Sequence, residues 1–534
     1  MSEISSRIFK FCRTPLTMCT LTLILLSCAA TPSRFDVPQD PDIRALQQAM
    51  AADQLSAEEL TRHYLERIAT FNPALLAVVE INPDALAIAI ELDKERAAGI
   101  VRSPLHGIPV LLKDNIDTAD KMKSTGGSLA LMEAPMPAQD AFVVQQLRAA
   151  GAVILGKANL SEWANFRSVT SSSGWSARGG QTVNAYNAEI TPCGSSAGSA
   201  VAVSADLTVL AVGTETDGSL ICPASNNGIV SIKPTLGLIS RSGIIPIAHS
   251  QDTAGPMTRS VADAAAMLSG MTGADAADPI TGERATSALD YTSYLQTGTL
   301  QGKRIGVLRH LSGRNPAVDQ LLELQLAVLR AGGATLVDLY PEIPAEMGNS
   351  EYQVLLYEFK YGINQYLSQR GGETTSLADL IAFNEANAEQ EMPWFAQEIF
   401  EQAQEKGDLT QPEYLEALSY SKLSSKGLLD QLLESEQLDA LVAPSNGPGW
   451  KIDLENGDNG GSVNYVSSAS LAAISGYPSI TVPAGFINDL PVGISFIGAA
   501  FSEPELIAIA YDYEQRSQAR RAPRLTLQPI DPAH

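Results

Sequence analysis

Histidine and cysteine are scarce in this chain of 534 residues, with five of each. The histidines are scattered, and no pair of cysteines has the spacing of a zinc site, so the sequence predicts no metal centre. A glycine-rich phosphate loop with its lysine is also missing. We therefore expect a protein whose chemistry needs neither a metal ion nor a bound cofactor.

Positive charge is scarce as well. Lysine and arginine total 36, against 60 aspartate and glutamate residues, which gives a formal net charge of −24. Nucleic acids and acidic lipids bind to basic surfaces, so neither is an expected partner. An acidic substrate would be repelled at long range, which favours a neutral or cationic small molecule or peptide. The apolar share of 45% is ordinary for a globular protein.

The N-terminal region has no apolar run long enough to cross a bilayer as an ordinary transmembrane helix. Its short apolar stretch at residues 21–28 follows three basic residues, Arg7, Lys10 and Arg13, and this order is typical of a secretory signal peptide. The stretch ends in Leu-Leu-Ser-Cys, which resembles a bacterial lipobox, whose cysteine becomes the lipidated N-terminus. Simple cleavage after Ala29 or Ala30 is the alternative.

These features predict how the chain is divided and where it works. We expect a signal peptide with a lipobox-like end at residues 1–28, a polar, proline-containing tether at residues 29–40 and one domain at residues 41–534. We also expect an exported bacterial protein, periplasmic or membrane-anchored through a lipid on Cys28, that is a monomer.

Strand-like and helix-like segments alternate along the domain. Apolar runs such as residues 108–112, 207–212 and 492–497 have the length and composition of buried strands, and residues 142–150 have the spacing of a helix. Residues 350–435 are predicted to be mostly helical. Alternating strands and helices form a sheet that helices cover on both faces, so we predict an α/β fold in a single large domain.

Serine and glycine gather in two segments of this domain. Residues 192–200 (Pro-Cys-Gly-Ser-Ser-Ala-Gly-Ser-Ala) predict a turn that opens a helix, where N–H groups and hydroxyls meet at the positive end of the helix dipole. Residues 213–219 (Gly-Thr-Glu-Thr-Asp-Gly-Ser) follow a buried strand, and Gly218 lets successive N–H groups point one way, as an oxyanion hole requires. A capped helix start and a polar turn are the structural alternatives.

A lysine upstream completes a candidate catalytic set. A serine hydroxyl is a poor nucleophile until a base takes its proton. Lys113 ends the apolar strand at residues 108–112, and a lysine becomes such a base when burial lowers its pKa towards neutrality. A solvated surface lysine is the structural alternative.

Two further cysteines, Cys193 and Cys222, flank the serine segments. We expect two small buried thiols packed behind the site, the common fate of such cysteines. An oxidising compartment would also permit a bridge between them.

Together these segments resemble the amidase signature family, over nearly the whole of the mature chain. Besides the two serine segments, the resemblance includes residues 107–115, 156–162, 180–184, 233–235, 237–240 and 252–256. Within the family, residues 175–182, 213–219 and 250–257 are most similar to the bacterial peptide amidases, which remove the amide from the C-terminal carboxamide of peptides. The resemblance implies the fold of that family, an α/β/α domain with a mixed central sheet.

The resemblance also implies a role for each site residue. Ser219 matches the acyl nucleophile, Ser195 the bridging serine that follows a cis peptide bond, and Lys113 the general base. The oxyanion hole matches the N–H groups of Thr216, Asp217, Gly218 and Ser219. The segment that borders the substrate in the family matches the loop with Val169, Ser171 and Trp175.

Two positions depart from the wider family. Many members carry glycine where this chain has Asp217, and arginine where it has Ile221. The three catalytic positions are untouched, but inferences about substrate from the wider family are weakened. The peptide-amidase branch shares both changes.

Other functions remain as alternatives. Amidases of aliphatic or aryl amides, and the amidotransferase subunit that supplies ammonia to aminoacyl-tRNA, belong to the same family. Residues 194–198 also fit the Gly-x-Ser-x-Gly turn of α/β-hydrolase esterases, with Ser196 as nucleophile; the histidines that follow are His249, His310 and His534. A non-catalytic solute-binding lipoprotein would bind its ligand without turnover.

Overall fold

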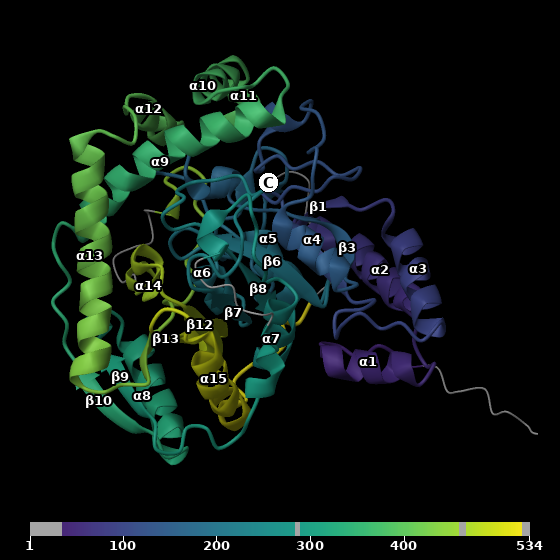
Figure 1. Ribbon diagram of the computed structural model, residues 1–534, viewed down its shortest axis with the longest axis vertical. Coiled ribbons are helices and arrows are strands. Elements are labelled where there is room, and N and C mark those ends of the chain that lie inside the picture. Colours follow the sequence, from purple (N-terminus) through teal and green to yellow (C-terminus); the bar gives the residue numbers. More distant parts are fainter. Residues whose placement is uncertain (1–34, 283–288, 459–465, 526–534) are drawn as a thin grey trace, which may run out of the picture.

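The computed structural model describes residues 35–282, 289–458 and 466–525 (Figure 1). The predicted signal peptide and lipobox lie outside these ranges. The last residues of the predicted tether are packed on the domain, because Phe35 N–H donates to Gln54 O at 2.9 Å and Arg520 pairs with Asp40 at 2.5 Å. None of the described helices has the length and apolarity needed to cross a membrane.

Eleven of the described strands form one mixed sheet, in the order β1-β3-β2-β6-β8-β7-β12-β13-β11-β9-β10. Its strands are β1 (Val78–Ile81), β2 (Pro109–Lys113), β3 (Val153–Ala158), β6 (Leu210–Glu215), β7 (Val230–Lys233), β8 (Thr253–Thr258), β9 (Arg304–Leu308), β10 (Thr335–Leu339), β11 (Ala440–Pro444), β12 (Ser479–Ile487) and β13 (Leu490–Ile497). A separate ribbon pairs β4 (Trp175–Ser176) with β5 (Gly180–Gln181). Strand β2 is parallel to β3 and β6, whereas β8 is antiparallel to both β6 and β7.

Helices cover this sheet. They are α1 (Ile43–Ala51), α2 (Ala57–Leu75), α3 (Ala85–Ala97), α4 (Phe142–Ala149), α5 (Ala197–Ser204), α6 (Ile221–Asn226), α7 (Val261–Ser269), α8 (Pro316–Ala331), α9 (Met347–Arg370), α10 (Leu377–Ala386), α11 (Ala388–Glu391), α12 (Glu398–Gln404), α13 (Pro412–Ser435), α14 (Ala469–Ser475) and α15 (Glu503–Ser517). The predicted α/β domain with a mixed sheet is confirmed.

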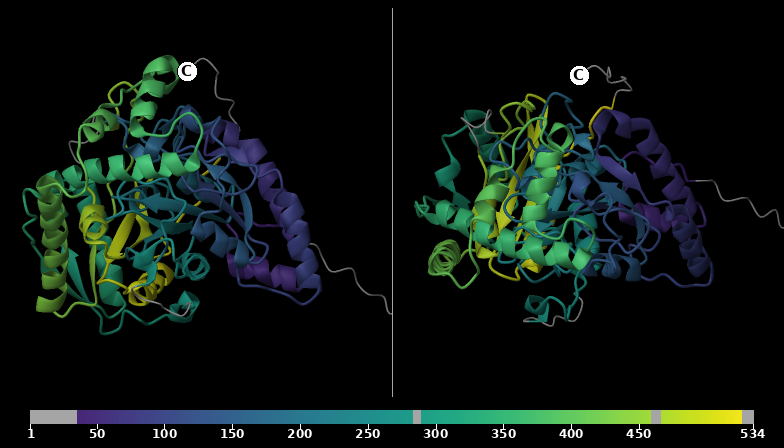
Figure 2. Two further views of the ribbon diagram at one scale, coloured as in Figure 1. Left: turned by 45° about the horizontal axis from the view of Figure 1, so that its top comes forward. Right: turned by 90° about the horizontal axis from the view of Figure 1, so that it is seen from above.

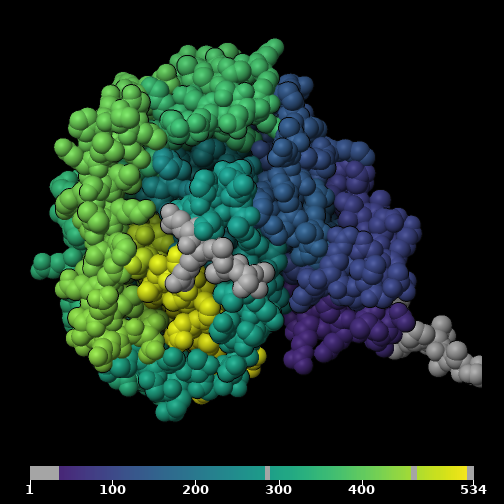
Figure 3. All heavy atoms as spheres, in the orientation of Figure 1, coloured from purple at the N-terminus to yellow at the C-terminus, as the bar shows by residue number. Residues whose placement is uncertain are grey.

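The helices α9 to α13 form an excursion beyond the layers of the sheet. Figure 2 shows α9 crossing above the sheet and α13 running along one side of the molecule. In the space-filling view they form a band along the upper and left edges (Figure 3). Their own apolar cluster includes Phe359, Ile363 and Phe400, which pack against Trp163 and Ile247 next to the serine segments. The excursion therefore forms one wall of the region where the two serine segments meet.

Strand register brings those segments to one edge of the sheet. Because β2 and β6 are parallel neighbours, with Leu112 opposite Val212, the residues after Leu112 and Val212 leave the sheet side by side. Strand β8 faces β6 with Thr253 opposite Glu215. Lys113, residues 214–219 and Asp252 are therefore placed together by backbone pairing alone.

Candidate active site

Lys113 is the last residue of β2 and is completely buried. Its Nζ donates to Ser195 Oγ at 2.8 Å, to Thr214 Oγ1 at 2.8 Å and to Thr214 O at 3.3 Å. Burial lowers the pKa of Lys113 to about 7, against the opposing influence of Asp252 and then Glu215. A lysine in this setting is largely uncharged just above neutral pH and can accept a proton.

The segment of Ser195 is built from close approaches that only small residues allow. The peptide bond between Gly194 and Ser195 is cis, and a Cβ at Gly194 would overlap Ser161 Oγ. A Cβ at Gly198 in the first turn of α5 would overlap Ala77 O. The helix is buried along its whole length, so the run of small residues reflects packing as well as chemistry.

The hydroxyl of Ser196 is hydrogen-bonded to the main chain. Its Oγ donates to Thr214 O at 3.0 Å and accepts the Thr214 N–H at 3.1 Å, and the residue is fully buried. Of the histidines expected to serve an esterase, His249 pairs with Glu358 at 3.3 Å and His310 lines a different cavity, while His534 lies outside the described residues. The contacts of Ser196 are those of a structural residue that ties the two serine segments together.

The turn before Ser219 is held by a buried carboxylate that sequence reasoning missed. Glu215 Oε2 accepts the N–H groups of Leu220 at 2.7 Å and Ile221 at 3.0 Å. Gly218 has φ +82°, the left-handed conformation that glycine adopts without strain. Within the ranges that the structure describes, no hydrogen bond uses the N–H of Asp217, Gly218 or Ser219. These N–H groups have the freedom that an oxyanion hole requires.

A cavity of about 470 Å³ opens onto this turn. It is lined by Thr216, Asp217, Gly218 and Ser219 from the turn and by Cys193 and Gly194 from the other serine segment. Asn446, Trp450 and Asp458 line it from the C-terminal part of the chain. Among the residues that the structure describes, no lysine or arginine lines this cavity, and its charged lining groups are the carboxyls of Asp217 and Asp458.

One of those carboxyls, Asp217, shares its surroundings with a second acid. Burial raises the pKa of Asp217 to about 6, and Glu351 of α9 lies within hydrogen-bonding reach of it. Burial, followed by the charge of Asp217, also raises the pKa of Glu351 well above its usual value. Glu351 in turn accepts Gln251 Nε2 at 2.8 Å. The contact between the two carboxyls lowers the pKa of Asp217 and raises that of Glu351, and it links α9 to the turn.

Cys193 and Cys222 form a disulfide, so the expectation of two free thiols was wrong. Ser196 N–H donates to Ser219 O at 3.3 Å and the two serine segments pack together, which brings both sulfurs to the wall of one cavity. Their sequence separation of 29 gave no sign of this proximity. The bridge joins the two serine segments covalently.

The loop expected to border the substrate lies beside the cavity. Ser173 of this loop lines it. Trp175 is buried and packs edge-on against Phe395 with ring centroids 5.1 Å apart. Ser171 Oγ donates to Ser168 O at 2.9 Å, and Val169 is 50% exposed with its N–H on Glu398. The roles suggested for these three residues stay predictions.

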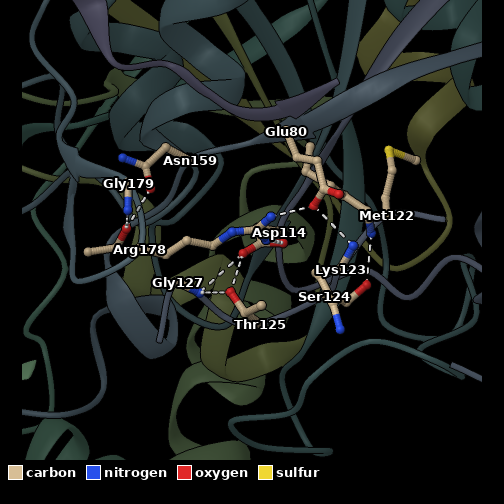
Figure 4. A network of polar contacts seen from close by, with 12 residues as sticks. Glu80, Asp114, Met122, Lys123, Ser124, Thr125, Gly127, Asn159, Arg178 and Gly179 are labelled. Atoms are coloured by element: carbon tan, nitrogen blue, oxygen red, sulfur yellow. Dashed lines mark hydrogen bonds and ion pairs between the residues drawn. The ribbon is translucent and has the colours of Figure 1, made fainter. Parts of the chain in front are cut away.

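A network of ion pairs lies one residue away from Lys113. Arg178 Nη1 donates to Asp114 Oδ1 at 2.8 Å, and Arg178 also pairs with Glu80 (Figure 4). Asp114 Oδ2 accepts Thr125 Oγ1 at 2.6 Å and Gly127 N–H at 3.3 Å. These contacts fix the chain where it leaves β2. In the described part of the chain, no group of three or more His, Cys, Asp or Glu side chains is placed to hold a metal ion.

Comparison with known proteins places the chain in a family. The Amidase family model matches residues 59–507. A probable amidase of Arabidopsis thaliana is 41% identical over 499 residues, which cover 91% of this chain and 92% of that protein. The chain therefore belongs to the amidase signature family and is an amidase hydrolase.

Solved structures of a peptide amidase are similar to this chain. A peptide amidase in complex with the competitive inhibitor chymostatin is 50% identical with a TM-score of 0.88, covering 91% of this chain and 99% of that one. Native peptide amidase from Stenotrophomonas maltophilia is 49% identical with a TM-score of 0.86, covering 90% and 98%. The mixed sheet and its covering helices are common to this group of structures.

Proposed function

We propose that this amidase hydrolyses the C-terminal carboxamide of peptides to a carboxylate and ammonia. The observation that carries the proposal is the contact of a fully buried Lys113, with a pKa of about 7, to Ser195 Oγ at 2.8 Å beside the turn of Ser219. The likeness to peptide amidase at 50% identity supports the choice of substrate.

The proposed reaction passes through an acyl-enzyme. Neutral Lys113 accepts the proton of Ser195 as Ser195 takes that of Ser219, and Ser219 Oγ attacks the amide carbon. The N–H groups of residues 216–219 stabilise the oxyanion. Ser195 then protonates the leaving nitrogen, the C–N bond breaks and ammonia departs. Water attacks the ester, Ser195 and Lys113 take its proton, and Ser219 recovers its own as the carboxylate leaves.

The charges that line the cavity also favour release of the product. Its charged lining groups are the carboxyls of Asp217 and Asp458. Burial raises the pKa of both carboxyls. Where they are ionised, they repel a carboxylate product but not the neutral amide. This difference favours release of product over its retention.

The direct experiment measures ammonia release from a panel of peptide C-terminal amides, free amino-acid amides, internal Asn or Gln peptides and aryl anilides. We expect peptide amides to be the best substrates, and Ser219→Ala to reduce kcat by about 10⁴-fold or more. Ser196→Ala is the matched control and should keep far more activity. A Ser219→Ala enzyme with near wild-type turnover would end the proposed mechanism, and a preference for anilides or free amino-acid amides would replace the substrate.

We further propose that the protein is exported as a monomer and anchored through a lipid on Cys28. The Cys193–Cys222 bridge supports an oxidising compartment, since disulfides persist there. Labelling of cells with a fatty-acid analogue should mark the wild type and not Cys28→Ala. Equal labelling of both proteins, or recovery of the wild type in the cytosol, would contradict the anchor. Light scattering of the purified domain should give the mass of one chain.

A further inference from the structure

A second cavity, of about 510 Å³, lies on the other side of the serine turn. Thr214, Thr216 and Asp252 line it, and Thr214 is the residue that accepts two hydrogen bonds from Lys113 Nζ. Thr216 lines both cavities. The chain from Thr214 to Thr216 therefore separates the two cavities. On the side of the second cavity it borders Asp252, a carboxylate that is not one of the proposed catalytic residues.

Asp252 holds this partition through both of its oxygens. Its Oδ1 accepts Thr216 Oγ1 at 2.6 Å, and its Oδ2 accepts the N–H groups of Ile247 and Ala248 at 2.9 Å each. The residue stands immediately before β8, whose Thr253 is opposite Glu215. Asp252 is thus fixed at its backbone and at its carboxylate, and it fixes Thr216 in turn.

We propose that Asp252 is a positioning residue of the amidase reaction: it sets the position of Thr216 at the start of the oxyanion turn, and its negative charge sets the pH range in which Lys113 works. This inference rests on the proposed function of Lys113 as the base. It assigns to Asp252 no contact with substrate.

The electrostatics of the site agree with this role. Burial depresses the pKa of Lys113, and Asp252 is the larger of the two charges that oppose this effect. The second of these charges, Glu215, already accepts hydrogen bonds from the N–H groups of Leu220 and Ile221. Without the charge of Asp252, less negative charge counteracts the effect of burial on Lys113, so the pKa of Lys113 should fall further.

Other titratable groups face Asp252 and must be considered. Arg241 lowers the pKa of Asp252, which burial raises to about 6. Arg241 is itself paired with Asp278, and His249 and Glu358 line the same cavity. Because the pKa of Asp252, about 6, lies below that of Lys113, about 7, Asp252 is ionised over most of the pH range in which the lysine is neutral.

The test compares Asp252→Asn with Asp263→Asn across a pH profile of kcat/KM. Asp263 is a matched control, since it is a buried aspartate whose pKa is also raised to about 6 and whose Oδ1 accepts the Ile43 N–H at 2.9 Å. The charges that act on Asp263 are those of Arg259 and Asp42, not of Lys113. An asparagine at position 252 loses the charge and can keep these contacts: its Oδ1 can accept the N–H groups of Ile247 and Ala248 while its Nδ2 donates to Thr216 Oγ1.

We expect the acid limb of Asp252→Asn to move to lower pH by roughly half a unit to one unit, while Asp263→Asn follows the wild type. An acid limb that does not move, or an equal shift in both variants, overturns the inference. If the wild type itself has no acid limb near pH 7, the proposed base fails instead. The two failures are therefore distinct.

Thr216 gives an independent measurement should Asp252→Asn not fold. Thr216→Val removes the hydroxyl that Asp252 holds and should lower the plateau of kcat by about tenfold or more, with the acid limb in place. Thr216→Ser keeps the hydroxyl and should restore the rate. A Thr216→Val enzyme with the wild-type plateau overturns the positioning role.

Discussion

Two regions at the ends of neighbouring strands each contain a completely buried lysine, and the surroundings of the two lysines differ. Lys113 on β2 and Lys157 on β3 are both fully buried, and the register of Leu112 opposite Lys157 places them on opposite faces of the sheet. Lys113 Nζ donates to the hydroxyls of Ser195 and Thr214. Lys157 Nζ donates to Ile116 O and to Ser124 Oγ, and the charges of Asp114, Asp117 and Asp120 act on it. Burial lowers the pKa of both lysines, and carboxylates oppose this effect at both: two of them at Lys113 and three at Lys157.

This difference separates a base from a structural cation. Hydroxyl partners let a buried amine lose its proton without stranding a carboxylate, and they give that amine a route to a nucleophile. The three aspartates near Lys157 favour its charged form, because the cation offsets part of their negative charge. The region of Lys157 and Arg178 therefore contributes to folding, and the region of Lys113 to chemistry.

Exchange of the two lysines for methionine should separate these roles most strongly. We expect Lys113→Met to lower kcat by about 10⁴-fold or more while the free energy of unfolding is preserved, since an apolar side chain replaces a poorly charged buried amine. Lys157→Met should keep most of the activity at low temperature and lose stability, because it removes positive charge near Asp120 and the buried carboxyls of Asp114 and Asp117. Ammonia release and urea unfolding report the two quantities. Equal effects of both variants on activity would erase the distinction between the regions.

Arg178→Met tests the ionic region directly. The variant leaves Asp114 and Glu80 without their shared cation, and loss of one partner of a buried pair costs about 3–5 kcal/mol of unfolding free energy. Arg62→Met is a surface control, because Arg62 and its partner Glu58 have side-chain exposures of 54% and 38%; it should change stability by less than about 1 kcal/mol. Similar losses in the two variants would show that the network in Figure 4 is not a stabilising element.

The disulfide should have a smaller effect. Closing a loop with a sequence separation of 29 contributes about 3.6 kcal/mol in the chain-entropy model, so Cys193→Ala with Cys222→Ala should lower the denaturation midpoint. KM should also rise, since both cysteines line the cavity of Ser219. Wild-type protein reduced under mild denaturation serves as the control. Quantitative alkylation of both cysteines in the native, unreduced protein would contradict the bridge.

Much of this structure was predictable from the sequence because its signals are local. Apolar runs and helical spacing indicated the strands and helices of the α/β domain, and the region at residues 350–435 is helical as expected. Strand β8 was not predicted, since Pro256 lies within it and proline is unusual in a strand paired on both sides.

What the sequence could not indicate depends on contacts between distant segments. The bond between Cys193 and Cys222 follows from the packing of two turns. The meeting of Asp217 with Glu351 needs α9 to lie across the sheet, and the hold of Asp252 on Thr216 needs the register of β8 on β6. Glu215 and Thr214 lie inside the serine segment at residues 213–219. Their hydrogen-bond partners, however, depend on the folded shape of the turn, which the sequence spacing does not indicate.

The pH dependence of kcat/KM for a peptide amide tests the central claim most directly. A base acts in its neutral form, and the pKa of Lys113 is about 7, so the rate should be flat above about pH 8 and fall towards tenfold per unit below about pH 6. The carboxamide does not titrate in this range, and an N-acetylated peptide amide without ionisable side chains has no α-amino group that could titrate, so the limb reports the enzyme. We predict that the acid limb of the wild type has its midpoint near pH 7. The residual activity of Lys113→Met should not show this limb. A flat profile from pH 5 to 9 would contradict an uncharged lysine as the base.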